Sequence, residues 1–283
     1  MAGTNLLSPD LANLLARTGD VMEGGVGKPS APGLRVGVDL GTAYTVVVAT
    51  DGAGQPLAGA YEFARVTRDG VVVDFRGAIE LVTRLKGEVE ARLGQSIESA
   101  ASGYPPGVAI SETRAIEYVL EAAGMTCSGL TDEPTAANEV LGLRDGAVVD
   151  IGGGTTGIAV FQDGRLVATE DEASGGTQAT LVLAGGLGIS VDEAEIVKRD
   201  PARHAEIAPL LRPVWEKIAT IVGRAIAPHD VPVLHLVGGT CRFPGIDAVV
   251  SSVTGVPATV PGDPLFVTSL GCAYRDAVTG GTA

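Results

Sequence analysis

The sequence predicts an α/β protein made of two similar lobes, because one pattern occurs twice in it. Residues 147–161, AVVDIGGGTTGIAVF, read as an apolar strand ending in Asp150, a turn of glycines and threonines, and a second apolar strand. Residues 34–50, LRVGVDLGTAYTVVVAT, repeat this order, with Asp39 in the matching place before a Gly-Thr turn. Two acid-tipped glycine hairpins in one chain indicate a duplicated unit whose halves face each other across a cleft.

Both turns have the composition of a phosphate-binding loop. Glycine has no Cβ, so the backbone N–H groups of such a turn can converge on an anion. The residues that we expect at the phosphates are Gly41, Thr42, Ala43, Tyr44, Gly152, Gly153, Gly154 and Thr155. Asp39 and Asp150 would be repelled by phosphate, but they can hold Mg²⁺, mostly through water, together with the phosphates. Either turn alone could be an ordinary glycine-rich hairpin, whereas the presence of both favours a phosphate cleft.

Composition argues against several classes of partner. The 283 residues suffice for two domains, and a hydrophobic content of 45% is ample for buried cores. With 34 acidic and 20 basic residues the net charge is -14, so we expect no nucleic-acid partner. No apolar run approaches the length needed to span a bilayer, so we expect no membrane partner. The cysteines are scattered without CxxC spacing, which favours a cytoplasmic location over a disulfide framework or a zinc site: Cys127, Cys241 and Cys272.

Residues 1–33 form an extension that differs from the rest of the chain. Ser8 can cap a short helix that ends near Gly19, and residues 24–33 form a Gly/Pro/Ser linker. The apolar residues of that helix share one face: Leu11, Leu14 and Leu15. We expect the helix to dock on the main body, and a partner-docking peptide is the alternative.

The remaining elements of the first lobe follow from periodicity and caps. Residues 57–64 and 66–75 read as two further strands that extend the first sheet. A helix at 77–94, a strand at 99–104 and a helix at 111–124, capped by Ser111, come next.

Residues 131–143, TDEPTAANEVLGL, indicate a short helix that begins near Glu133. Its face of small residues allows close contact with another helix, so this segment can be a hinge between the lobes. The helix dipole favours the ionised form of a carboxylate at this end, which by itself explains Glu133 and lowers its value as a general base.

In the second lobe, a strand at 165–170 leads to a loop at Gly175 and Gly176. A helix at 190–198 places Glu195 and Lys198 on one face, where the alternative to a binding role is an exposed ion pair. A long helix at 207–226 should bury Trp215.

Residues 233–246, VLHLVGGTCRFPGI, read as a strand that breaks at Gly238 and Gly239. Two glycines would let a flat base lie against the backbone, and the guanidinium of Arg242 could stack on it. A final helix at 265–276 can pack against the helix that follows Glu133.

In this order the segments resemble the actin-like ATPase superfamily, which includes actin, Hsp70 chaperones, sugar kinases and bacterial filament proteins. The resemblance implies a duplicated actin-like (RNase H-like) two-lobe ATPase fold. Because the chain is short, its outer subdomains must be reduced. The implied lobes are residues 34–145 and 146–283.

The same resemblance implies roles for individual residues. Asp39 and Asp150 would hold Mg²⁺, and Glu133, in a sequence that matches the Hsp70 EPTAA segment, would position the attacking water. The residues implied at the nucleoside and at the start of the second lobe's helices are Gly175, Gly176, Glu195, Lys198, Gly238, Gly239 and Arg242. Lys86 is the nearest candidate for an Hsp70 lysine that reaches the phosphates, but the local match is loose, and we expect a solvated lysine on a charged helix instead.

Several details are similar to the EutJ family, ethanolamine-utilisation proteins described as chaperonin-like: GVDLGTAYTVV, YPPG, TDEPTAAN, VDIGGGTTGIAV and LAGGLGIS-x-x-EAE-x-x-K. This resemblance implies a cytoplasmic protein that binds ATP/ADP and Mg²⁺ and serves an enzyme or shell protein of a bacterial microcompartment. We expect an ATP-driven, chaperone-like switch and slow Mg²⁺-dependent hydrolysis. A nucleotide-binding scaffold or filament subunit, which would be a homo-oligomer, is the alternative, and a small-molecule kinase is a weaker one.

Overall fold

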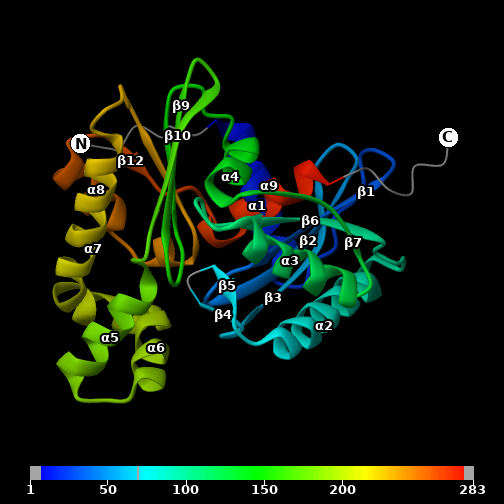
Figure 1. The fold of residues 1–283 in the computed structure, drawn as a ribbon, viewed down its shortest axis with the longest axis horizontal. Coiled ribbons are helices and arrows are strands. Elements are labelled where there is room, and N and C mark those ends of the chain that lie inside the picture. Colours follow the sequence, from blue (N-terminus) through cyan, green and yellow to red (C-terminus); the bar gives the residue numbers. More distant parts are fainter. Residues whose placement is uncertain (1–7, 69, 277–283) are drawn as a thin grey trace.

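The computed structural model describes residues 8–68 and 70–276, which form two lobes that lie side by side (Figure 1). Each lobe contains a five-stranded mixed sheet, and the strand orders correspond. The first sheet has the order β3 (Pro56–Phe63), β2 (Tyr44–Asp51), β1 (Leu34–Leu40), β6 (Ser99–Tyr104), β7 (Thr126–Asp132). The second has the order β10 (Arg165–Glu172), β9 (Thr156–Gln162), β8 (Gly146–Ile151), β11 (Leu234–Val237), β12 (Ala258–Thr259).

The hydrogen-bonding directions also repeat. In each lobe the first strand pairs antiparallel with the second, as β1 with β2 and β8 with β9, and parallel with the strand on its other side, as β1 with β6 and β8 with β11. The predicted duplicated, two-lobe α/β architecture is therefore confirmed.

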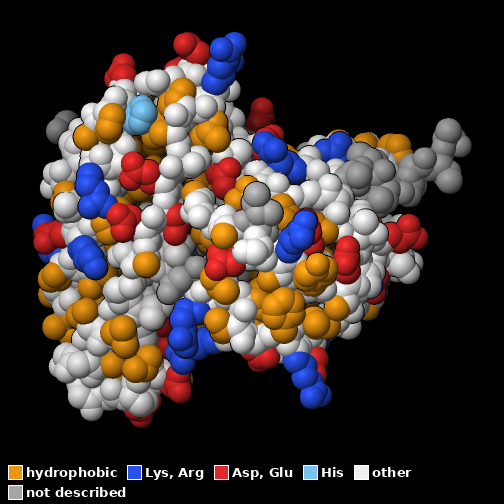
Figure 2. All heavy atoms as spheres, viewed as in Figure 1, with side chains coloured by type: hydrophobic (Ala, Val, Ile, Leu, Met, Phe, Trp, Pro, Cys, Tyr) orange, Lys and Arg blue, Asp and Glu red, His pale blue; other side chains and the backbone are white. Residues whose placement is uncertain are grey.

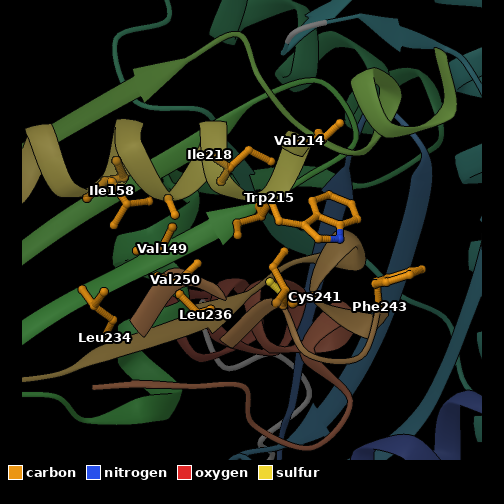
Figure 3. Packing of buried hydrophobic residues seen from close by; sticks show 14 of the residues in the cluster. Val149, Ile158, Val214, Trp215, Ile218, Leu234, Leu236, Cys241, Phe243 and Val250 are labelled. Atoms are coloured by element: carbon orange, nitrogen blue, oxygen red, sulfur yellow. The ribbon is translucent and has the colours of Figure 1, made fainter. Parts of the chain in front are cut away.

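Helices pack beside each sheet. Their bounds are α2 (Phe75–Leu93) and α3 (Ile110–Ala122) in the first lobe, and α5 (Gly176–Leu187), α6 (Val191–Arg199), α7 (His204–Ile226) and α8 (Ile246–Thr254) in the second. The helices α5 and α6 lie at the lower end of the second lobe, where α5 contacts α7 (Figure 1). In the second lobe, Ile218 of α7 and Leu236 of β11 belong to one buried apolar cluster (Figure 3). This packing fixes the position of α7 on the sheet, and therefore the positions of the α7 residues that line the cleft.

Two helices between the sheets connect the lobes: α4 (Glu133–Leu141) and α9 (Val267–Arg275). The helix α4 follows the last strand of the first sheet but packs on β8 and β9 of the second, whereas α9 packs on β1, β2 and β6 of the first. The two helices cross with their backbones almost in contact, because a Cβ on Gly271 would collide with the carbonyl oxygen of Ala136. Asp276, just after α9, accepts a 2.8 Å hydrogen bond from the backbone N–H of Val36 and so ties α9 to β1.

The N-terminal helix α1 (Pro9–Met22) is docked on the body, as expected. Leu11 and Leu15 are buried against α4, α9 and β9, and Met22 packs against strands of the first sheet. The linker that follows is tied down at Asp51, whose carboxylate accepts hydrogen bonds from the N–H groups of Ser30 and Ala31. Residues 1–7 of the extension lie outside the described residues.

Some sequence-based expectations for the first lobe were wrong. Residues 66–75 do not extend the first sheet: β4 (Thr67–Arg68) and β5 (Val71–Val72) form a separate hairpin. The end of this segment belongs to a helix instead, because the side chain of Asp74 caps α2 by accepting a 2.9 Å hydrogen bond from the N–H of Gly77. Ser111 lies inside α3, whose N-cap is Ala109, so it is not the cap. In the part of the chain that the structure describes, no helix has both the length and the apolar content that crossing a bilayer requires.

Candidate functional site

A cleft of about 490 Å³ lies between the lobes and is lined by both glycine turns. Seventeen of the eighteen predicted site residues line it: Asp39, Gly41, Thr42, Ala43, Tyr44, Glu133, Asp150, Gly152, Gly153, Gly154, Thr155, Gly176, Glu195, Lys198, Gly238, Gly239 and Arg242. The exception is Gly175, which lies behind the second turn, where a Cβ would be 2.6 Å from the carbonyl oxygen of Gly152. Figure 2 shows Lys and Arg side chains gathered at the lower end of the boundary between the lobes.

The two glycine turns contact each other. A Cβ on Gly153 would lie 2.9 Å from the Cβ of Ala43, so only a glycine lets the second turn approach the first this closely. The second turn is held from behind, because the N–H of Gly176 and the hydroxyl of Thr240 both donate to the carbonyl oxygen of Gly152, at 3.0 and 2.7 Å. The turns are thus a preformed pair rather than two independent loops.

Three carboxylates meet at the base of this pair. Burial, and next the nearby charge of Asp150, raise the pKa of Asp39 to about 7. Burial raises the pKa of Asp150 to about 6, although a hydrogen bond from the hydroxyl of Thr268 lowers it. Burial and the charges of Asp39 and Asp150 raise the pKa of Glu133 well above its usual value. The expectation that the helix dipole secures the ionised form of Glu133 was therefore wrong, because burial and neighbouring acids outweigh the dipole, whereas its role in orienting water stays a prediction.

This set of donors fits Mg²⁺. Buried carboxylates that repel one another are stabilised by a cation, and carboxylate oxygens are the ligands that Mg²⁺ prefers. Among the described residues, no group of three or more His, Cys, Asp or Glu side chains is arranged to bind a metal ion. A magnesium ion here would therefore be held by Asp39 and Asp150 together with water and the ligand's own oxygens.

The Glu195 and Lys198 pair is buried rather than exposed, with side-chain exposures of 9% and 16%. The Lys198 ammonium donates to Oε2 of Glu195 at 2.8 Å, to the hydroxyl of Thr180 at 2.8 Å and to the carbonyl oxygen of Gly176 at 3.0 Å. An ammonium has three donors, so all of them are used within the protein. Lys198 therefore fixes α6 against the start of α5, and a ribose contact would require it to release one of these bonds.

Arg242 lies at the cleft, but its guanidinium faces aromatic residues. The guanidinium carbon is 5.0 Å from the ring centroid of Phe266 and 5.8 Å from that of Tyr61. The Asp263 carboxylate is 3.8 Å away and partly neutralises it. These are contacts that a guanidinium can exchange for a flat base of similar character.

Sequence reasoning missed a second arginine, Arg199. It lines the cleft, its guanidinium carbon lies 4.2 Å from the ring centroid of Phe63, and it donates to the Tyr44 hydroxyl at 3.5 Å. Arg199 directly follows Lys198, which was predicted to lie at the cleft, and this adjacency was the feature of the sequence that could have identified it. A nearby ion pair of 2.8 Å between Arg65 and Asp192 also joins the two lobes. Cations of the second lobe and aromatic rings of the first thus meet across the mouth of the cleft.

Contacts within the protein explain why positions 238 and 239 are glycines. Gly238 has φ of +92°, and a Cβ there would collide with Oδ1 of Asp150. Its lack of a side chain is therefore required by the acid in the protein, whatever ligand binds. Gly239 faces Leu265 and the ring of Tyr44, where a Cβ would be at 3.2 and 3.7 Å.

Lys86 does not line the cleft, so the less favoured of its two interpretations, a lysine at the phosphates, was wrong. Its ammonium pairs with Oε1 of Glu90 at 2.7 Å, and the same oxygen accepts from the N–H of Ile97 at 2.7 Å. The side chain, which was considered because of the Hsp70 resemblance, thus lies near the residues that lead into β6. The first lobe does contribute Arg65 and Arg68 to the lining of the cleft.

Comparisons with known proteins agree with this architecture. Family models for the cell division protein FtsA and the MreB/Mbl protein match residues 147–271 and 58–180. The ethanolamine utilization protein EutJ of Salmonella typhimurium (strain LT2) is 43% identical over 241 residues, which cover 85% of each chain. The crystal structure of EutJ from Carboxydothermus hydrogenoformans superposes with a TM-score of 0.89 at 46% identity, over 94% of this chain and 98% of that one. MreB5 of Spiroplasma citri, solved bound to ADP, shares the fold at a TM-score of 0.66 and 18% identity, over 84% and 94% of the two chains. The predicted actin-like fold is confirmed.

Proposed function

The chain belongs to the EutJ family, and from this premise we propose that it is a Mg²⁺-dependent ATP-binding switch that hydrolyses ATP slowly. In this proposal it acts in ethanolamine utilisation as a chaperone-like protein whose client is an enzyme or shell protein of a bacterial microcompartment. Its location would be cytoplasmic, in association with that compartment.

One observation carries the proposal: two glycine turns in contact at Gly153 and Ala43, with three carboxylates directly behind them. A nucleoside triphosphate with its cation complements both halves of this arrangement. Its phosphates suit the turns, and its cation suits the acids. The arginines and aromatic rings at the mouth suit a base.

The chemistry expected of the site follows from the acids. Bound Mg²⁺ would supply charge neutralisation for the phosphates, and Asp39 and Asp150 would hold it. Glu133 lies beside the two acids that would hold the cation, where it is suited to orient a water molecule, and its raised pKa makes it a stronger base than an ordinary carboxylate. Closure of the lobes around the nucleotide would then be the switching motion.

The proposal is tested by two measurements on the same protein. Calorimetry should show ATP binding that strengthens when Mg²⁺ is added, and a phosphate-release assay should show slow turnover that an added ethanolamine-utilisation enzyme or shell protein accelerates. ATP binding without turnover, alone or with those proteins, would contradict the hydrolysing switch. Absence of any nucleotide binding would contradict the proposed function as a whole.

A second candidate is a nucleotide-binding scaffold that assembles into oligomers. Apolar side chains are exposed on the outer helices of the second lobe, among them Leu181 at 53% and Ile196 at 62%. Burial of these side chains against another protein surface, which can be another copy of the chain, would be favourable. Sedimentation with and without ATP distinguishes the two, because only a scaffold should form large particles with ATP while releasing no phosphate.

A further inference from the structure

The N-terminal helix α1 packs on both lobes at the place where they meet. In its first half, Leu15 belongs to a buried cluster with Phe161 of β9 and Val237 of β11, in the second sheet. Its last residue, Met22, lies on the first sheet instead, because a Cβ on Gly59 of β3 would collide with the Met22 Sδ. Figure 1 shows α1 beside α4 and α9, the two helices that connect the lobes. One helix about 20 Å long therefore spans the hinge.

Closure of the lobes, as proposed above, would change the surface on which α1 rests. The helix α4 packs on the second sheet and α9 on the first, so a rotation of one lobe against the other displaces the two parts of this surface. A helix of this length moves as one body, so α1 cannot keep its contacts with both lobes through such a rotation. The strength of its docking must therefore differ between the open and the closed arrangement.

The end of α1 also contacts two partners of Arg242, which lines the cleft. A Cβ on Gly19 would collide with Oδ2 of Asp263, and Oδ1 of the same carboxylate is 3.8 Å from the Arg242 guanidinium. Glu23, directly after α1, accepts a 2.9 Å hydrogen bond from the hydroxyl of Tyr61. The ring centroid of Tyr61 is 5.8 Å from the guanidinium carbon of Arg242. The end of α1 thus fixes an acid and an aromatic ring that Arg242 contacts.

We propose that α1 is a displaceable element whose docking opposes nucleotide binding in the cleft. Docked α1 holds the lobes in the arrangement described here, and it holds Asp263 and Tyr61 where they engage Arg242. A nucleotide that closes the lobes and draws Arg242 away from these partners works against both sets of contacts. Coupling between two equilibria is reciprocal, so bound nucleotide loosens α1 by the same factor by which docked α1 weakens nucleotide binding. This inference rests on the proposed nucleotide-binding function and adds a segment that regulates it.

Hydrogen exchange measured by mass spectrometry on the full chain tests the effect of nucleotide on α1. With saturating Mg²⁺-ATP, the backbone amides of α1 should exchange several-fold faster than without it, because weaker docking lets the helix open more often. The helix α8, which packs on α7 and β12, is the internal control and should not exchange faster. If calorimetry shows that ATP binds but α1 is equally or better protected, the inference is wrong and the nucleotide site stands. If ATP does not bind, the proposed function fails as well.

Leu15→Ala tests the effect of α1 on the nucleotide. The variant loses packing beneath α1 and should bind ATP several-fold more tightly by calorimetry, whereas a general loss of stability would weaken binding. Leu120→Ala makes the same truncation on α3, in the core of the first lobe, and should not tighten ATP binding. Weaker or unchanged ATP binding in Leu15→Ala would show that α1 has only a structural role.

Glu23→Ala tests the same coupling at an exposed position, where folding is not at risk. It removes the acceptor of the Tyr61 hydroxyl and should tighten ATP binding about two- to tenfold, the scale of one hydrogen bond. Tyr61→Phe removes the donor of the same bond, so the double variant should gain no more than either single one. Asp20→Ala removes an exposed acid from the same end of α1 and should bind ATP as wild type does. Wild-type affinity in both Glu23→Ala and Tyr61→Phe would overturn the link between α1 and Arg242.

Discussion

The hydroxyl of Thr268 donates a 2.6 Å hydrogen bond to Oδ2 of Asp150, although the two residues are 118 positions apart. The bond joins the first turn of α9 to the last part of β8, and both side chains are buried. A hydrogen bond to a carboxylate favours its ionised form, which is the form that holds a cation. Thr268 was not among the predicted site residues, yet it controls the charge of one that was.

Replacing Thr268 by Val should therefore weaken Mg²⁺-ATP binding in a pH-dependent way. Loss of the bond raises the pKa of Asp150 further above its present value of about 6, so more of the carboxyl is protonated near neutral pH. We expect affinity to fall several-fold near neutral pH and to recover at higher pH, as calorimetry across the pH range can measure. Thr268→Ser keeps the donor and should behave as wild type. Equal losses at every pH would point to a packing defect instead.

Removal of one buried acid should stabilise the ligand-free protein at alkaline pH. The pKa of Asp39 is about 7 in the folded protein against 3.8 ordinarily, so folding takes up a proton between these values. The resulting stabilisation is complete below the unfolded pKa and is lost as the pH rises through about 7, and Asp150 contributes likewise up to about 6.

Asp39→Asn should therefore raise the free energy of unfolding by about 1 to 3 kcal/mol at about pH 8 without Mg²⁺, and by much less at about pH 5. Urea unfolding at both pH values measures this difference. Asp230→Asn, at an exposed position, removes the same unit of charge and is the control. If the free energy of unfolding rises equally in both variants, the effect comes from the change in net charge and not from the burial of Asp39.

Glu133→Gln distinguishes a hydrolysing switch from a scaffold. The amide keeps the shape of the side chain but cannot accept a proton, so nucleotide affinity should persist while turnover falls by roughly 10²-fold or more. Single-turnover phosphate release provides the measurement. Glu139→Gln, on the same helix but paired with Arg275 at the surface, should leave turnover unchanged. A Glu133→Gln variant as fast as wild type would exclude Glu133 from the reaction.

Gly153→Ala should separate the two turns. The new methyl group would lie 2.9 Å from the Cβ of Ala43, closer than two carbons normally approach, so one turn must move. We expect ATP affinity to fall about tenfold or more, since the phosphates bind both turns at once. Gly185→Ala, where a Cβ would meet nothing within 4 Å, is the matched control and should bind ATP normally. Unchanged affinity in Gly153→Ala would show that the phosphates do not depend on the contact between the turns.

The parts of the fold that local sequence determines were predictable. Both hairpins follow from β-branched runs that end at glycines, and α6 begins at Ser190, whose side chain caps it as expected. The strand β7 was missed, because its sequence, TCSGLTD, is polar and mostly not buried. It is a strand because it pairs with β6, and such pairing between distant segments is not visible in the residues themselves.

The same distinction applies to the site. Glycines and acids at the ends of strands could be placed in the cleft, because the turn that carries them is local. The sequence could not show that Arg199 lines the cleft and Lys86 does not, since each is a cation on a helix. Only the packing of that helix decides where the side chain points. The pKa of Glu133 depends likewise on acids contributed by other elements.

The exchange of α4 and α9 between the sheets has a consequence for how the protein folds. Each helix packs on the sheet of the other lobe, so neither lobe can complete its core from its own contiguous segment. A fragment cut between β7 and β8 would leave an apolar sheet face bare in both products. The lobes should therefore unfold in a single cooperative transition, and two separately expressed halves would be insoluble alone and soluble only as a reassembled pair.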